Sequence, residues 1–169
     1  MGQHQETELK FRVVDLKAVR RRLAELGAAR DGRSDEENLI FDDAAGRLAA
    51  AGVLLRLRQD QRATLTAKTP VDDPRFKVRR ETEVEVSSFD GARALLEALG
   101  FGVVASYRKD RETWRLAGAA VLLDELAFGC FVEIEADPDA IERAVGLLGL
   151  DLTSGITLSY LDLQAESRR

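Results

Sequence analysis

The chain has 169 residues, enough for one domain with a sizeable core, and its 25 Lys and Arg against 30 Asp and Glu give a net charge of −5. This acidic balance argues against nucleic acid or an anionic membrane as a partner. A single cysteine, Cys130, excludes an intramolecular disulfide, and a single histidine, His4, argues against histidine-based metal or nucleophilic sites. Because no apolar run is long enough to span a bilayer, we expect a cytoplasmic protein. The length of the chain predicts one domain over residues 1–169.

The first predicted element is a strand that begins at Glu6. Side chains on a strand alternate between its two faces, so Glu6, Glu8 and Lys10 share one face and Thr7 and Leu9 take the other. A single strand of this kind normally turns its charged side to water. The orientation of this strand therefore depends on whether other strands repeat the pattern.

The same alternation of charged and apolar residues recurs along the chain. Between two of these strands, residues 69–77 contain two prolines and are predicted to be a loop, either a lid over a site or an inert connection. The further predicted strands cover residues 35–42, 53–62, 64–68, 78–86, 103–116, 121–126 and 129–136.

Three helices are predicted from their capping signals. Asp15 begins the first, Ser88 or Asp90 the second, and Pro138 stands at the first position of the third. Gly27 and Gly100 end the first two. Residues 156–163 are apolar enough to pack as a strand or a helix. The residues expected to face inward from the second helix are Ala92, Leu95, Leu96 and Leu99.

Two sets of charged residues share the charged faces of these strands. An open sheet would expose them as a salt-bridged surface that adds little stability. However, the opposite faces are apolar and can receive the helices, so we predict an antiparallel barrel, or tunnel, with helices outside and a charged lumen. The carboxylates are Glu6, Glu8, Glu81, Glu83, Asp124, Glu133 and Glu135, and the cations are Lys10, Arg56, Arg58, Lys68, Arg79, Lys109 and Arg111.

So many ionisable groups in one lumen would be costly to desolvate unless a ligand and ions complete their neutralisation. Carboxylate oxygens in Glu-x-Glu pairs suit Mg²⁺ or Mn²⁺. Arginine and lysine suit the oxygens of a polyanion such as a triphosphate. The combination predicts a metal–triphosphate site, and the alternative is mutual salt bridging with no ligand.

These motifs resemble the CYTH superfamily, also called triphosphate tunnel metalloenzymes, in order over nearly the whole chain. The resemblance implies an α+β fold built on a closed eight-stranded antiparallel tunnel, with glutamates holding a divalent metal. By position, it implies metal ligands at Glu6, Glu8, Glu133 and Glu135, with Asp124 at a further acidic position, and triphosphate contacts from Lys10, Arg56, Arg58, Lys68, Arg79, Lys109 and Arg111.

Within the superfamily, the sequence around Glu8-Leu9-Lys10 and the late Ser159-Tyr160-Leu161 look most like the class IV adenylyl cyclase branch. That resemblance implies conversion of ATP to cyclic AMP and pyrophosphate, and it suggests a homodimer. The chain departs from the branch at Glu36 and Ile40, where Gln and Tyr are usual. The alternatives are a triphosphatase acting on thiamine triphosphate, inorganic triphosphate or a nucleotide, and a non-enzymatic nucleotide or polyphosphate sensor.

Overall fold

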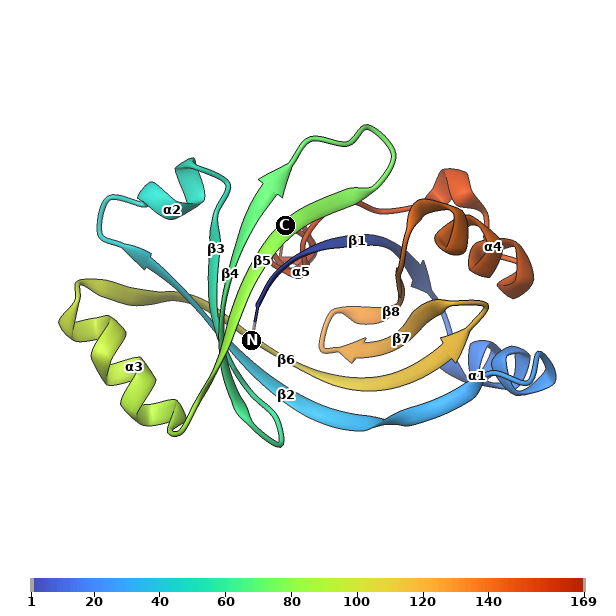
Figure 1. Ribbon diagram of the computed structural model, residues 1–169, viewed down its shortest axis with the longest axis horizontal. Coiled ribbons are helices and arrows are strands. Elements are labelled where there is room, and N and C mark those ends of the chain that lie inside the picture. Colours follow the sequence, from blue (N-terminus) through green and yellow to red (C-terminus); the bar gives the residue numbers. More distant parts are fainter. Residues whose placement is uncertain (1, 169) are drawn as a thin grey trace. The chain divides into compact units, whose positions relative to one another are not determined.

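A computed structural model describes residues 2–168. Within them, eight antiparallel strands close into a barrel in the order β1-β5-β4-β3-β2-β6-β7-β8, with five α-helices outside it (Figure 1). The predicted fold class, α+β with a closed eight-stranded antiparallel barrel, is confirmed. The strands are β1 (Gly2–Val13), β2 (Ala29–Asp43), β3 (Leu54–Gln59), β4 (Ala63–Val71), β5 (Lys77–Val86), β6 (Phe101–Leu116), β7 (Ala119–Leu126) and β8 (Gly129–Glu135).

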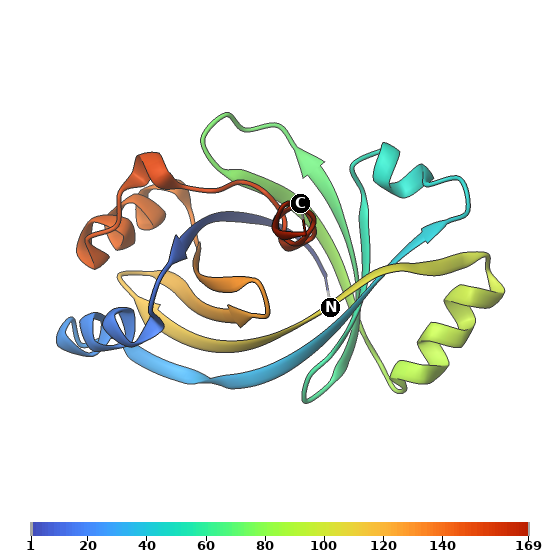
Figure 2. The same cartoon turned by 180° about the vertical axis from the view of Figure 1, so that it is seen from behind.

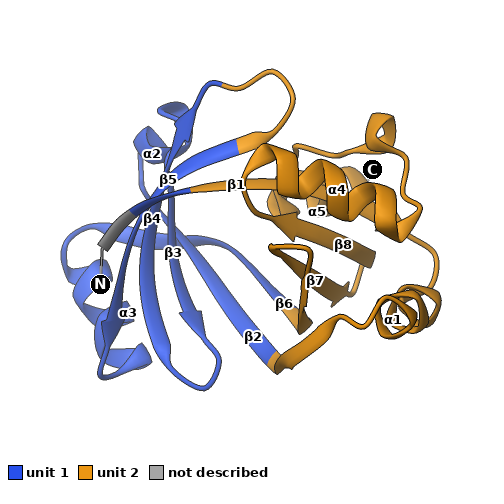
Figure 3. Ribbon diagram, turned by 45° about the vertical axis from the view of Figure 1, so that its right-hand side comes forward, with its two compact units in different colours: residues 1–5, 35–72, 78–108 blue, residues 6–34, 73–77, 109–169 orange. Residues whose placement is uncertain are grey.

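The chain forms two compact units, each built from several segments (Figure 3). Unit 1 comprises Asp35–Asp72 and Val78–Arg108 together with the N-terminal residues as far as Gln5. Unit 2 comprises Glu6–Ser34, Asp73–Lys77 and the residues from Lys109 onward. The single domain over residues 1–169 stays a prediction.

Two helices of unit 2 follow their capping signals. In α1 (Leu16–Glu25), the Asp15 side chain accepts a hydrogen bond from the Lys17 amide, and Leu16 and Leu23 are buried. In α4 (Pro138–Leu148), the Asp137 side chain accepts from the Ala140 amide. Each cap satisfies a backbone N–H that the first helical turn leaves without a partner, so the sequence predicted both helix starts correctly.

The longer helix of unit 1, α3 (Phe89–Ala98), begins after Ser88, one of the two predicted starts, but buries less than expected. Leu96 packs with Leu39, Phe41 and Leu57, whereas Leu95 is 62% exposed and Leu99 is 66% exposed. The prediction that Leu95 and Leu99 face inward is therefore wrong. The contact face runs through residues 89, 92 and 96 at helical spacing, so positions 95 and 99 fall on a neighbouring stripe.

The connections also differ from expectation. A short helix that the sequence did not predict, α2 (Arg47–Ala50), lies between β2 and β3, where Asp42 accepts hydrogen bonds from the Leu48 and Ala49 amides. The predicted loop over residues 69–77 is shorter: β4 continues to Val71 and β5 begins at Lys77.

The C-terminal segment is a 3₁₀ turn, η1 (Leu152–Ser154), followed by the helix α5 (Tyr160–Ser167), seen end-on in Figure 2. Ser159 and Asp162 cap α5 reciprocally, each side chain accepting from the other residue's backbone amide. Of the two alternatives for residues 156–163, the helix is thus confirmed for Tyr160 onward. Across residues 2–168, no helix combines the length and apolar character needed to cross a membrane.

Candidate metal and phosphate site

Strand pairing in unit 2 brings together charged residues that are far apart in the sequence. The register of β1 and β8 places Glu8 opposite Glu135 and Lys10 opposite Glu133. Directly opposed residues on antiparallel strands have Cβ atoms about 4.5–5.5 Å apart. The first and last strands of the chain's barrel thus put three carboxylates and one ammonium side by side.

Glu6, Glu8 and Glu135 form the carboxylate triad of this site. Each offers an oxygen that lies within 4.8 Å of the oxygens offered by the other two. Glu8 is buried, and Glu6 and Glu135 are half-buried. Three converging hard oxygen donors fit Mg²⁺ or Mn²⁺, which favour carboxylate ligands. The donor set of the triad is therefore compatible with the divalent metal expected from the sequence.

The electrostatics of the triad show how crowded these carboxylates are. Burial, followed by the charge of Glu6, raises the pKa of Glu135 to about 8, although Arg111 opposes this. A carboxyl group normally titrates near 4.5. Near neutral pH, Glu135 therefore holds a proton in the absence of a cation, and a metal that binds there must displace it.

We expect Mn²⁺ to raise the melting temperature more at about pH 8.5 than at about pH 6. Because folding raises the pKa of Glu135 from 4.5 to about 8, the stability due to its protonation is fully present below pH 4.5 and is lost as the pH rises through 8. Above that pH a bound cation relieves the repulsion between the carboxylates of the triad without displacing a proton. Thermal unfolding with and without Mn²⁺ measures the effect, and equal shifts at the two pH values would contradict it.

Two lysines lie against the triad and Glu133. Lys10 is 1% exposed, and its Nζ lies 2.8 Å from Glu133 Oε1 and 3.4 Å from Glu8 Oε1. The Nζ of Lys77 lies 2.5 Å from the same oxygen of Glu8. Burial disfavours the Lys10 ammonium, but Glu133 and Glu8 outweigh it and raise its pKa above the usual value. Lys10 is therefore held as a cation at the edge of the triad, and Lys77 pairs with the same oxygen of Glu8.

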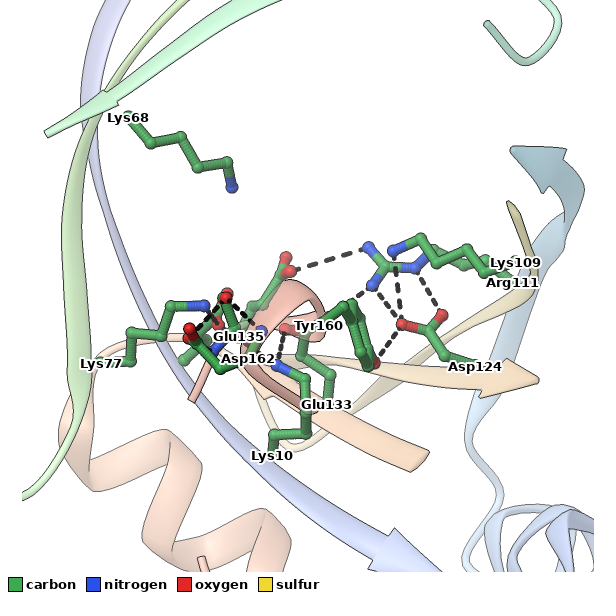
Figure 4. Close-up of polar contacts among 12 residues, drawn as sticks. Lys10, Lys68, Lys77, Lys109, Arg111, Asp124, Glu133, Glu135, Tyr160 and Asp162 are labelled. Carbon is green, nitrogen blue, oxygen red and sulfur yellow. Dashed lines mark hydrogen bonds and ion pairs between the residues drawn. The ribbon is translucent and has the colours of Figure 1, made fainter. Parts of the chain in front are cut away.

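Arg111 and Asp124 form the second part of the site in unit 2 (Figure 4). Arg111 donates to both oxygens of Asp124, from Nε at 2.7 Å and from Nη2 at 2.5 Å, and it also donates to Glu133. Asp124 is fully buried and accepts further bonds from Lys109 Nζ at 3.3 Å and from the Tyr160 hydroxyl at 2.6 Å. These donors surround Asp124, whereas the oxygens of the triad converge on one another.

The structure thus separates the five carboxylates expected to bind metal. Glu6, Glu8 and Glu135 converge. Glu133 is paired with Lys10 and Arg111, which hold the pKa of its buried carboxyl well below the usual range, and Asp124 is surrounded by cations and a hydroxyl.

The remaining predicted cations lie in unit 1. Arg56 is 8% exposed, with Nη2 4.0 Å from Glu83 Oε2, and Lys68 forms an ion pair with Glu81. Arg58 Nε lies 3.4 Å from Asp60 Oδ2, and Arg79 donates from Nη1 to the Gly52 carbonyl at 2.7 Å. Cross-strand pairing puts Arg56 and Arg58 on the same face of the sheet as Lys68.

Two residues of the site were not predicted from the sequence. Lys77 was assigned to a loop, although it stands two residues before Arg79 and so shares the charged face of β5. In the sequence Tyr160 contributed only to the family resemblance. In the structure, the centroid of its ring lies 4.3 Å from Lys10 Nζ, and its hydroxyl donates a hydrogen bond to Asp124. Strand alternation could have identified Lys77, whereas no local pattern reveals where Tyr160 docks.

Comparisons with known proteins identify relatives of this chain. A curated relative from Methanocaldococcus jannaschii, named "Putative adenylate cyclase MJ0240", is 28% identical over 132 residues, covering 77% of this chain and 75% of its own. The PH1012 protein of Pyrococcus horikoshii OT3 superposes with a TM-score of 0.81 at 27% identity, over 94% of this chain and 98% of its own.

The HpAC1 protein from Hippeastrum has the same fold, with a TM-score of 0.71 at 23% identity over 95% of each chain. The family model described as the CYTH domain matches residues 4–147. That match includes every residue predicted above to bind metal or triphosphate. The chain therefore belongs to the CYTH domain family.

Proposed function

We propose that the protein is a Mg²⁺- or Mn²⁺-dependent adenylyl cyclase that converts ATP to cyclic AMP and pyrophosphate. The observation that carries this proposal is the convergence of Glu6, Glu8 and Glu135 beside the cations Lys10 and Lys77. Acidic ligands for a divalent ion next to cations for phosphate oxygens match the needs of a metal-bound triphosphate. The relative named as an adenylate cyclase supports cyclisation as the reaction.

In this proposal, Glu6, Glu8 and Glu135 hold the metal, and Glu133 and Asp124 position the cations around it. A divalent cation supplies charge neutralisation on the phosphate oxygens and on the departing pyrophosphate. Cyclisation forms a bond from the ribose 3′ oxygen to the α-phosphorus, breaks the bond to pyrophosphate and releases the hydroxyl proton. The residues proposed to contact phosphate are Lys10, Arg56, Arg58, Lys68, Arg79, Lys109 and Arg111, with Lys77 added.

The preorganisation of Arg111 is what favours catalysis over passive binding. Its guanidinium is fixed through Nε and Nη2 by the buried carboxylate of Asp124, which the Tyr160 hydroxyl holds in turn. A cation that is already oriented costs little reorganisation when negative charge develops on a phosphate.

Hydrolysis by a triphosphatase is the second candidate, because it needs the same ligands and cations with water as the nucleophile. The solved structure of HpAC1, which shares this fold, is described as revealing a dominant triphosphatase activity. The fold is thus compatible with both reactions, and their products distinguish them.

The test is to incubate the protein with Mn²⁺ and ATP, thiamine triphosphate or tripolyphosphate and to separate the products. We expect cyclic AMP and pyrophosphate from ATP, and no product when a chelator removes the metal. Orthophosphate without a cyclic product would replace the cyclase proposal with the triphosphatase. A lack of turnover with every substrate would contradict both enzymes and favour the sensor.

A further inference from the structure

Asn38 on β2 is a buried side chain whose hydrogen-bonding groups are unused. It is 0% exposed, and among the residues that the structure describes neither its Oδ1 nor its Nδ2 has a hydrogen-bond partner. A buried amide without partners normally costs stability, and native proteins pair nearly all such groups. An amide with a free donor and a free acceptor therefore points to a ligand that supplies both partners.

The strand register places Asn38 in a row with other polar groups of unit 1. Asn38 lies opposite Arg58 on β3, and Arg58 lies opposite Thr64 on β4. Thr64 is 7% exposed, and its hydroxyl also lacks a partner within residues 2–168. By contrast, the hydroxyl of Thr66, two residues along the same strand, donates to Glu83 at 2.7 Å. The row of Arg58 thus contains both a buried amide and a buried hydroxyl that have no partner among the described residues.

This row lies on the polar face of the sheet. Leu39 and Leu57, the adjacent residues of the same strands, point to the opposite face and pack against α3. Arg56 stands two residues from Arg58 on the polar face, so the unused amide and hydroxyl lie opposite Arg58 and diagonal to Arg56, two cations proposed to bind phosphate. Opposed side chains on such strands are about 5 Å apart at their Cβ atoms.

The chemistry of the unused groups differs from that of the arginines beside them. A neutral amide and a hydroxyl add no charge to a phosphate site, but they can form hydrogen bonds with the polar edge of a heterocyclic base. An asparagine amide pairs through two bonds with adenine, donating to a ring nitrogen and accepting from the exocyclic amino group. The row therefore combines a phosphate contact with groups suited to a heterocyclic base.

We propose that Asn38 and Thr64 form a recognition subsite for the base of a nucleoside triphosphate whose phosphates contact Arg56 and Arg58. This inference rests on the proposed function, because it assumes a triphosphate on the arginines. It adds which residues contact the base, and so how the site would distinguish a nucleoside triphosphate from inorganic triphosphate.

The test uses Asn38→Leu, which removes both amide groups at nearly constant volume. The dissociation constants of ATP and of tripolyphosphate are measured by calorimetry with a chelator present, so that turnover does not consume the ligand. We expect the constant for ATP to rise at least about tenfold while that for tripolyphosphate is unchanged. The melting temperature should rise, because the variant buries no unpaired amide.

Further ligands and variants locate the effect. Purine riboside triphosphate, which lacks the amino group of adenine, should bind the wild-type protein more weakly than ATP and should bind Asn38→Leu as well as ATP does. Thr64→Val should weaken ATP binding selectively. Thr82→Val, the same change at an exposed position of β5, should alter neither ligand. Arg56→Ala should weaken both.

The possible outcomes distinguish a failure of the base subsite from a failure of the proposed function. If the wild-type protein binds both ligands and Asn38→Leu leaves the ATP constant unchanged, the base subsite is wrong and the triphosphate site stands. If Asn38→Leu weakens both ligands equally or lowers the melting temperature, Asn38 has a structural role and the inference is overturned. Failure of the wild-type protein to bind either ligand overturns the proposed function and this inference together.

Discussion

Replacing Glu6 with glutamine is expected to lower metal-dependent turnover by at least about 100-fold, since residues that merely support metal ligands already contribute 10–100-fold. Glu6 is one of the three carboxylates whose oxygens converge, and an amide in its place removes a negative charge from the triad at nearly constant shape. Glu6 is only half-buried, so the fold should survive. Turnover as a function of Mn²⁺ concentration measures the effect, and Mn²⁺ affinity measured without substrate should fall in parallel.

Glu125→Gln is the matched control for this change. Glu125 is exposed on β7, next to Asp124 in sequence but on the other face of the strand. The same loss of charge there should leave metal affinity and turnover as they are. Unchanged metal affinity in Glu6→Gln, with the melting temperature retained, would remove Glu6 from the metal site.

Replacing Lys10 with methionine is expected to lower the free energy of unfolding by about 3–5 kcal/mol, the usual result of removing one partner from a buried ion pair. Lys10 is 1% exposed and lies within ion-pair distance of Glu133 and Glu8, both 4% exposed. Without the ammonium, each carboxylate keeps only a less buried partner, Lys77 for Glu8 and Arg111 for Glu133. Urea unfolding at neutral pH gives the free energy, with Lys17→Met, an exposed position of α1, as the control.

The same variant distinguishes a metal site from a purely structural salt-bridge cluster. Because Lys10→Met leaves the acidic side of the site less neutralised, Mn²⁺ should stabilise the variant more than it stabilises the wild-type protein. A smaller stabilisation of the variant, or none, would indicate that the carboxylates near Lys10 exist to bind cationic side chains alone.

Much of the local structure follows from short-range patterns. Asp15 caps α1 and Pro138 opens α4, because the chemistry of a helix end depends on a few neighbouring residues. Alternation along β1 placed Glu6, Glu8 and Lys10 on one face, since successive side chains of a strand must point to opposite sides. The exposure of Leu95 and Leu99 could not be predicted, because it depends on which stripe of α3 meets the sheet.

The barrel strands and the face that their charged residues share could be predicted from the sequence, because both follow from a repeat of two residues. Which of these charges meet depends on how the strands pair in the folded chain. The register that sets Glu8 opposite Glu135 joins strands more than 120 residues apart. A register shifted by two residues would keep every side chain on the same face, so the alternating pattern alone cannot select the observed pairing. The pairing of β6 with β7 set Arg111 opposite Asp124, and the docking of α5 brought the Tyr160 hydroxyl to the same carboxylate. Strand pairing also left the Asn38 amide buried beside Arg58 without a partner among the described residues.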